Sequence, residues 1–204
     1  MLTARDVMSQ LLKSEIVYFD KPGPQNTETT LKVAKERAQK LGLKDVVLAS
    51  ISGETGVKAC EYFKGSNVLV VSHCTGWKEP GMQEMTDEKR MKIEKNGGRL
   101  LICSHAFAGI ERAIRTKLNT VYPIEIISDT LRILGNGTKV AVEIVVMATD
   151  AGLIPINRDV IAIAGTSRGA DTALVVQPAN SVRFFDLVIK EIIAKPRITR
   201  LPSE

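Results

Sequence analysis

Aromatic residues are scarce in this chain of 204 residues, of which only 4% are Phe, Trp or Tyr. A protein that stacks nucleic-acid bases on aromatic rings needs more of them. The formal net charge is +5, but the basic residues alternate with acidic ones, as in "LKVAKERAQK" and "EKRMKIEK". This pattern is typical of solvated helix faces, so we expect no nucleic-acid partner.

Cysteines and long apolar runs are also few. Cys60, Cys74 and Cys103 form no CxxC pair, which is typical of reduced thiols in an intracellular protein. No segment approaches the length of a membrane span. The opening "MLTARDVMSQLL" lacks the long apolar stretch and cleavage site of a signal peptide. We therefore expect a cytoplasmic protein with no membrane partner.

The chain does contain a regular alternation of apolar, β-branched runs with helical patterns. The strand-like runs are "EIVYF", "VVLAS", "NVLVVSH", "RLLICS", "DVIAIAG", "TALVVQP" and "DLVIKEIIA". Continuous apolar strands separated by helices predict a parallel sheet covered on both faces. No repeat, low-complexity segment or linker interrupts the pattern, so we expect a single α/β domain over residues 1–204.

Helical spacing marks the connecting segments. In "TETTLKVAKERAQKLG" we expect Asn26 or Thr27 as the N-cap and Gly42 as the C-cap. Further helices are expected up to Phe63, before "NGG", and in "GIERAIRTKL" and "YPIEIISDTLRILG". "KVAVEIVVMATDAGL" is nearly all apolar, and its length and Gly152 predict a buried helix, although "VEIVVMA" alone also fits a strand or an assembly surface.

The stretch "ASISGETG" joins a strand to a helix, and ligands of open α/β sheets bind at such strand ends. Ser52 can cap the helix, and the hydroxyls of Ser50 and Thr55 add donors near its positive end. Gly53 lets backbone N–H groups approach an oxyanion, so a side chain there is expected to occupy the oxyanion's space. Glu54 opposes an anion unless it points away. Alone, the stretch fits a capped turn as well as a phosphate loop.

A second polar loop, "AGTSRGADTA", lies between two strands. Gly165 and Gly169 permit a close approach, and Arg168 supplies a planar cation suited to phosphate. Asp171 and Thr172 add polar contacts. The alternative is an ordinary hairpin loop with Arg168 in solvent.

These two loops occur in a familiar order. "DVVLASISGETGVKACEYFKGSNVLVVSHCTG" resembles the C-terminal α/β domain of pyruvate kinase, and "VIAIAGTSRGADTALVVQP" resembles a later segment of that domain. In pyruvate kinases activated by sugar bisphosphates, the two loops together hold the phosphates of the effector. Because the sequence has no counterpart of the catalytic barrel, we expect no pyruvate kinase activity.

Over nearly its whole length the chain is similar to a family of stand-alone, mostly archaeal and bacterial proteins with this fold, which share stretches such as "YFDKPGPQNTETTL" and "DAGLIP". The resemblance implies a three-layer α/β/α fold with a mostly parallel, mixed sheet. It also implies FMN, or another small phosphorylated ligand. It implies no reaction, so both a flavin-dependent oxidoreductase and a non-catalytic sensor of a phosphorylated metabolite remain open.

The resemblance also implies the site residues. In the first loop they are Ser50, Ser52, Gly53, Glu54 and Thr55, and in the second Gly165, Thr166, Arg168 and Gly169, with Asp171 and Thr172 just beyond.

Three further residues, His73, Thr75 and Gly76, follow the next strand and are expected to face the same crevice. His73 can bond a ligand or transfer a proton, or it can be satisfied by local backbone. Trp77 can stack on a flavin ring or lie at a subunit contact, so homo-oligomerisation remains open.

The remaining His and Cys residues do not predict a metal site. "HC" is adjacent and "CSH" is tight, and neighbouring residues of a strand point to opposite faces. No set of residues resembles a nucleophile with its base and orienting partner, so no catalytic residue is assigned.

Overall fold

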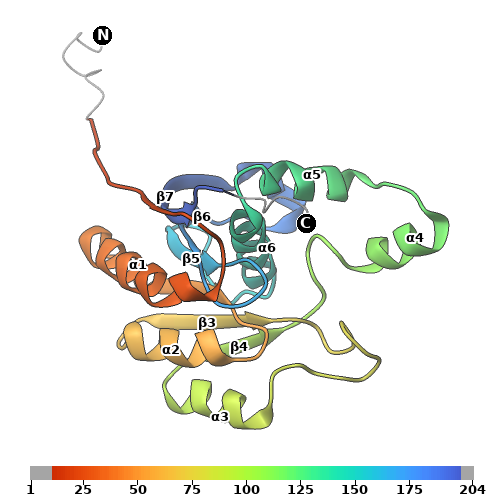
Figure 1. Cartoon of the computed structure of the whole chain (residues 1–204), viewed down its shortest axis with the longest axis horizontal. Helices are drawn as coiled ribbons and strands as arrows, with labels where there is room; N and C mark the ends of the chain where they lie inside the picture. Colours follow the sequence, from red (N-terminus) through yellow and green to blue (C-terminus); the bar gives the residue numbers. More distant parts are fainter. Residues whose placement is uncertain (1–10, 199–204) are drawn as a thin grey trace.

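The computed structural model describes residues 11–198, in which seven strands form one mixed sheet (Figure 1). The strands are β1 (Val17–Phe19), β2 (Asp45–Ala49), β3 (Asn67–Ser72), β4 (Arg99–Ile102), β5 (Val160–Ala164), β6 (Thr172–Gln177) and β7 (Val188–Pro196). Their order across the sheet is β1-β7-β6-β5-β2-β3-β4. Only β6 runs antiparallel to its neighbours, β5 and β7, and the other pairs are parallel.

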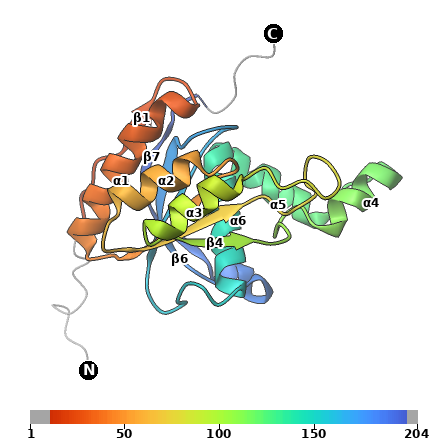
Figure 2. The same cartoon turned by 90° about the horizontal axis from the view of Figure 1, so that it is seen from below.

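Helices cover both faces of this sheet (Figures 1 and 2). They are α1 (Thr27–Leu41), α2 (Glu54–Tyr62), α3 (Asp87–Lys95), α4 (Ile110–Leu118), α5 (Pro123–Arg132) and α6 (Asn136–Asp150), with the short 3-10 helices η1 (Pro24–Asn26) and η2 (Ser181–Asp186). The side chains of each strand alternate between two cores. Val46 and Leu48 of β2 pack on the side of α1 and α2, whereas Val47 packs on the side of α6. The expected three-layer α/β/α fold with a mostly parallel, mixed sheet is confirmed.

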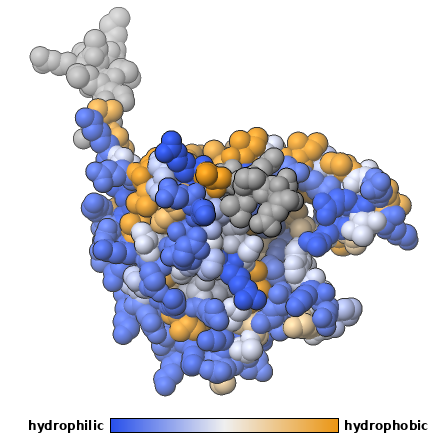
Figure 3. Space-filling model, viewed as in Figure 1, coloured by the Kyte–Doolittle hydropathy of each residue, from blue (hydrophilic) through white to orange (hydrophobic). Residues whose placement is uncertain are grey.

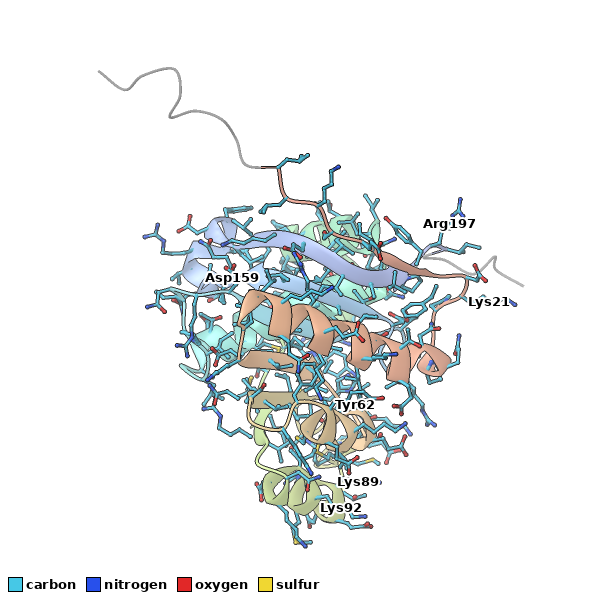
Figure 4. All side chains as sticks on the ribbon, turned by 90° about the vertical axis from the view of Figure 1, so that its left-hand side faces the viewer. Lys21, Tyr62, Lys89, Lys92, Asp159 and Arg197 are labelled. Carbon is cyan, nitrogen blue, oxygen red and sulfur yellow. The ribbon has the colours of Figure 1, made fainter. Side chains whose placement is uncertain are left out.

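Helices α1 and α2 cover one face of the sheet, and they are joined by polar contacts at the surface as well as by the core. Glu28 of α1 accepts hydrogen bonds from the hydroxyl of Tyr62 (2.7 Å) and from Lys58, both on α2. Figure 4 shows Tyr62 at the edge where α2 meets α1. Gly42 ends α1 in a left-handed conformation (φ 68°), as expected, and Asn26 is the N-cap, although its side chain bonds the carbonyl of Lys21 instead of the helix.

The apolar segment "VEIVVMA" is part of the helix α6, as its length predicted, and every residue from Gly137 to Thr149 except Val140 is buried. Because α6 packs against β2, β3, β5 and β6, its apolar surface is internal. The interpretation of this segment as an assembly surface is therefore wrong.

Helix α4 differs from the other α-helices of residues 11–198 because none of its residues is buried. It extends away from the sheet in both cartoon views (Figures 1 and 2). Ile110, Leu118 and Val121 are 77%, 62% and 68% exposed, and Figure 3 shows hydrophobic residues on the surface from α5 towards α4. Within residues 11–198, every helix is too short or too polar to cross a bilayer.

Candidate functional site

A cleft of about 1130 Å³ opens where β2, β3, β4 and β5 end. Its floor consists of the segments that follow these strands, and its walls come from α4, α5 and α6. Parallel strands present their carboxyl ends at one edge of a sheet, and the connecting loops diverge there. The cleft therefore lies where the strand pattern predicts a ligand site.

The loop after β2 contributes Ser50, Ser52, Glu54 and Thr55 to the cleft. The buried Ser50 hydroxyl accepts a hydrogen bond from the backbone N–H of Gly56 (3.1 Å), which ties the loop to the first turn of α2. The backbone N–H groups of Glu54 and Thr55 have no acceptor within residues 11–198. Two unpaired donors at a helix start are suited to an anion.

The N-cap of α2 is Gly53, in a left-handed conformation (φ 86°), so the expected cap at Ser52 is wrong. A Cβ atom on Gly53 would lie 2.7 Å from Cβ of Lys89 and 3.3 Å from Cγ of Met85. Gly53 does not line the cleft. Glycine is therefore required by the backbone conformation and by contact with the segment that starts α3. The expectation that a side chain at this position would occupy the space of an oxyanion is wrong.

Glu54 is exposed and lines the cleft, and it makes no ion pair within residues 11–198. Its carboxylate is the one negative group of this loop. Glu54 lies in the first turn of α2, where the helix dipole stabilises a negative charge. A bound phosphate must therefore compete with the Glu54 carboxylate for the positive end of α2, or displace this side chain.

The loop after β5 forms a hairpin with β6, and it brings Gly165, Arg168 and Gly169 to the same cleft. Arg168 is exposed, and its guanidinium has no hydrogen-bond or ion-pair partner among residues 11–198. A Cβ atom on Gly169 would lie 2.5 Å from Cα of Pro24, so this glycine allows the loop to pack against η1. The backbone N–H of Ala170 also donates to Thr27 Oγ1 (3.0 Å).

Asp171 and Thr172 are completely buried and do not line the cleft. Oδ2 of Asp171 accepts hydrogen bonds from the backbone N–H groups of Gly23 (3.0 Å) and Thr166 (3.1 Å), and Oδ1 accepts one from the Thr172 hydroxyl (2.8 Å). This carboxylate therefore joins the loop before α1, which contains Gly23, to the loop after β5, which contains Thr166. It supports the cleft from behind.

The structure thus brings together eight of the fourteen expected site residues. The residues that line the cleft are Ser50, Ser52, Glu54, Thr55, His73, Gly165, Arg168 and Gly169. Those that do not are Gly53, Thr75, Gly76, Thr166, Asp171 and Thr172. Gly76 instead lines a smaller neighbouring hollow beside α4.

His73 follows β3 and is held by a carboxylate. Its Nδ1 lies 2.7 Å from Oε2 of Glu84, and both side chains are 22% exposed. The alternative of a histidine satisfied by local backbone is therefore not what the structure contains. The ring centroid of His73 lies 4.9 Å from that of Trp77 and 5.1 Å from that of His105.

Trp77 is already engaged by protein groups. It stacks on His105, with the ring centroids 4.2 Å apart and the planes 18° apart. The guanidinium carbon of Arg112 lies 4.3 Å from its ring centroid. A flavin ring that stacked on Trp77 would compete with these contacts.

Helix α6, which forms one wall of the cleft, carries a buried ion pair that we did not predict from the sequence. Lys139 Nζ lies 2.6 Å from Oε2 of Glu143, and Oε1 of Glu143 accepts a hydrogen bond from the backbone N–H of Phe107 (3.0 Å). Nδ1 of His105 lies 3.9 Å from the same Oε1, beyond hydrogen-bonding distance. A Lys and a Glu four residues apart in an otherwise apolar helix were the available signal.

Burial lowers the pKa of His105 to about 4, although the charge of Glu143 acts in the opposite direction. Nε2 of His105 is enclosed and has no hydrogen-bond partner. At neutral pH the ring is therefore uncharged.

The thiols of the chain are unpaired in the structure. Cys60, Cys74 and Cys103 form no disulfide, and burial raises the pKa of Cys60 to about 11, so its thiolate is not populated at neutral pH. Across residues 11–198, the acidic, His and Cys side chains form no cluster of three that could hold a metal ion.

A seven-stranded mixed sheet with helices on both faces defines a three-layer α/β protein. The family model of the pyruvate kinase alpha/beta domain matches residues 28–176, which is most of the chain. The protein belongs to this family. The match spans β2 to β6, and it therefore includes both loops at the cleft.

Proposed function

We propose that the cleft binds a small phosphate-bearing molecule. The observation that carries this proposal is the meeting of two loops from distant parts of the chain. Ser52 and Thr55 lie beside unpaired N–H groups at the start of α2, and Arg168, whose guanidinium has no partner in residues 11–198, lines the same cleft. Backbone donors at a helix start together with a guanidinium are the groups that bind phosphate in proteins.

FMN is the ligand that we propose first. A cleft of about 1130 Å³ is slightly larger than the usual range of about 300–1,000 Å³ for small-molecule sites, so it has room for a nucleotide. Ile51, Met82, Ile144 and Met147 add apolar surface beside the polar floor. Bound FMN would supply hydride or electron chemistry. A non-catalytic sensor of a phosphorylated metabolite requires the same phosphate loops but no flavin.

Titration calorimetry with FMN and with fructose 1,6-bisphosphate separates these functions. Binding of FMN, with a yellow protein whose flavin is reduced by NAD(P)H, supports the oxidoreductase. Binding of the sugar bisphosphate alone rejects the flavin and supports the sensor. Failure of both ligands to bind contradicts the proposed phosphate site.

The double substitution Ser52→Ala and Arg168→Ala tests the shared site. We expect an affinity loss of about 10- to 100-fold, because a charge-assisted hydrogen bond contributes about 1.5–3 kcal/mol. Arg183→Ala is the matched control, since Arg183 is an exposed arginine on η2 outside the cleft. An unchanged affinity in the double variant, with an unchanged melting temperature, would refute the shared site.

A further inference from the structure

Both histidines of the chain line the same cleft, although they follow different strands. Their ring centroids lie 5.1 Å apart, and each ring lies near a glutamate. His73 is bonded to Glu84, whereas His105 lies near Glu143 without a hydrogen bond. The sheet brings the two rings together because β3 and β4 are parallel neighbours that end side by side.

The bond to Glu84 determines how the His73 ring is used. In a neutral ring, a carboxylate acceptor at Nδ1 places the ring proton there, so Nε2 keeps a free electron pair. Nε2 of His73 makes no hydrogen bond within residues 11–198, and it is not among the enclosed unpaired atoms. His73 therefore has the arrangement of a general base that is oriented by a carboxylate.

The loop that carries Glu84 is already anchored without this bond. Nε2 of Gln83 donates to the carbonyl of His73 (3.0 Å), and Oε1 of Gln83 accepts from the backbone N–H of Met85 (3.0 Å). Met85 itself is 2% exposed and packs in the core. Glu84 is therefore not needed to attach the loop, and its contact with His73 calls for another explanation.

The surroundings of His73 indicate what it acts on. The hydroxyl of Ser50 is bonded to the backbone N–H of Gly56, and the hydroxyl of Ser72 is bonded to the carbonyl of Ile51. The Ser72 hydroxyl donates its proton to this carbonyl, so Ser72 is not positioned as a nucleophile for His73 to activate. The ring of His105 adds no positive charge beside His73 at neutral pH. We take a ligand bound in the cleft as the source of the proton that His73 accepts.

We propose that the cleft catalyses proton transfer on a phosphorylated hydroxycarbonyl compound, with His73 as the catalytic base and Glu84 as its positioning residue. This proposal rests on the phosphate site of the proposed function, with the hydroxycarbonyl compound in place of FMN, because the loops with Ser52 and Arg168 anchor the phosphate. The C–H bond next to the carbonyl breaks, its proton passes to Nε2 of His73, and its electron pair forms an enolate. Arg112 also lines the cleft, and it is the cation that can stabilise the enolate, because Arg168 is engaged by the phosphate. Return of the proton to carbon completes the cycle, with no oxidant or co-substrate.

Deuterium incorporation in D₂O, followed by ¹H NMR, tests this chemistry. The probes are dihydroxyacetone phosphate, fructose 6-phosphate and ribose 5-phosphate. With the unmodified protein, we expect the C–H signal next to the carbonyl of at least one probe to disappear faster than in buffer. For His73→Asn and for His73→Gln we expect the exchange rate to fall about 100-fold or more, because general-base catalysis contributes about 10²–10⁴.

Glu84→Gln separates a positioning role from a structural one. Glutamine keeps an acceptor for Nδ1–H but loses the charge, so we expect the exchange kcat to fall about 10-fold while KM stays nearly constant. Arg183→Ala, prepared in the same way, is expected to exchange at the original rate. Circular dichroism of each variant confirms that the fold is retained.

The results distinguish this proposal from the proposed function. Exchange that is lost in both His73 variants supports the proton-transfer site. Exchange that persists in them, or no exchange with any of the three probes, overturns it. Calorimetric binding of a probe without exchange leaves the phosphate site intact and rejects only the proton transfer.

Discussion

Single buried polar residues maintain the shape of the cleft. Asp171 is completely buried, and its two oxygens accept three hydrogen bonds, from Gly23, Thr166 and Thr172. A buried carboxylate is tolerated when its oxygens are fully hydrogen-bonded. Asp171 thus fixes the loop before α1 against the loop after β5, and Arg168 projects from the second of these loops. The residue acts on the site through the backbone and does not line the cleft.

His105 is expected to make the stability of the protein depend on pH. Its pKa of about 4 lies below the ordinary value of 6.5, so the unfolded chain binds a proton in this interval that the folded protein does not. The free energy of unfolding should therefore be independent of His105 titration above pH 6.5. As the pH drops from 6.5 towards 4, the free energy of unfolding should fall by at most about 3 kcal/mol.

Urea unfolding at pH 7 and pH 5 measures this effect. We expect His105→Gln to show a smaller loss between these two pH values than the unmodified protein. The same loss in both proteins would show that His105 is not desolvated. The Cε1–H resonance of His105 gives its pKa directly, since the chain has only one other histidine.

At the scale of elements, α6 combines an apolar packing role with a charged one. It contacts four strands and also carries the Lys139–Glu143 pair at the cleft wall. Burying two charges costs free energy, which their attraction and the hydrogen bond from Phe107 offset. The exposed helix α3 carries a similar Glu–Lys pair four residues apart, Glu88–Lys92. Exposed pairs of this kind contribute little to stability.

We expect Glu143→Leu to lower the free energy of unfolding by about 3–5 kcal/mol, because it leaves the Lys139 charge buried without a partner. Lys139→Met combined with Glu143→Leu should cost much less, since no unpaired charge remains. Glu88→Leu on α3 is the control and should change stability by less than about 1 kcal/mol. Urea unfolding measures all three, and equal effects of Glu143→Leu and Glu88→Leu would contradict the account.

At the scale of the whole molecule, packing is uneven. The sheet with α1 and α6 forms two continuous cores, whereas α4 extends from the body without a buried residue (Figure 2). An isolated helix of nine residues is marginal in water. Arg112 and Arg115 of α4 nevertheless line the cleft, so the least packed helix supplies part of the ligand site.

Hydrogen exchange should reflect this difference. We expect the backbone amides of α4 to exchange at least about 100-fold faster than those of α6, because α4 opens without disrupting a core. Mass spectrometry of peptides from the two helices measures the ratio. Slow exchange in α4 would contradict the prediction and indicate that a second copy covers Ile110 and Leu118, which sedimentation velocity would then detect.

Much of the fold follows from local patterns. The alternation of apolar strands and helices predicted all seven strands. The signal is clearest for β2, β3 and β5, because buried parallel strands read as continuous apolar runs. The same pattern predicted α6 as a buried helix from its length. The sequence also identified two loops, the Ser- and Gly-containing loop after β2 and the Arg168 loop after β5. Both contain turn residues within a short segment, and both segments resemble those of a known family.

The sequence by itself therefore determined the layered α/β fold and the two loops at the strand ends. Only the tertiary structure decided which residues of those loops face the cleft, because strand register and hairpin geometry turn Arg168 outwards and Asp171 inwards. It also decided that Glu84 meets His73 and that Glu143 lies beside His105. These partners are eleven and thirty-eight residues apart in the chain, and only the packing of separate segments brings them together.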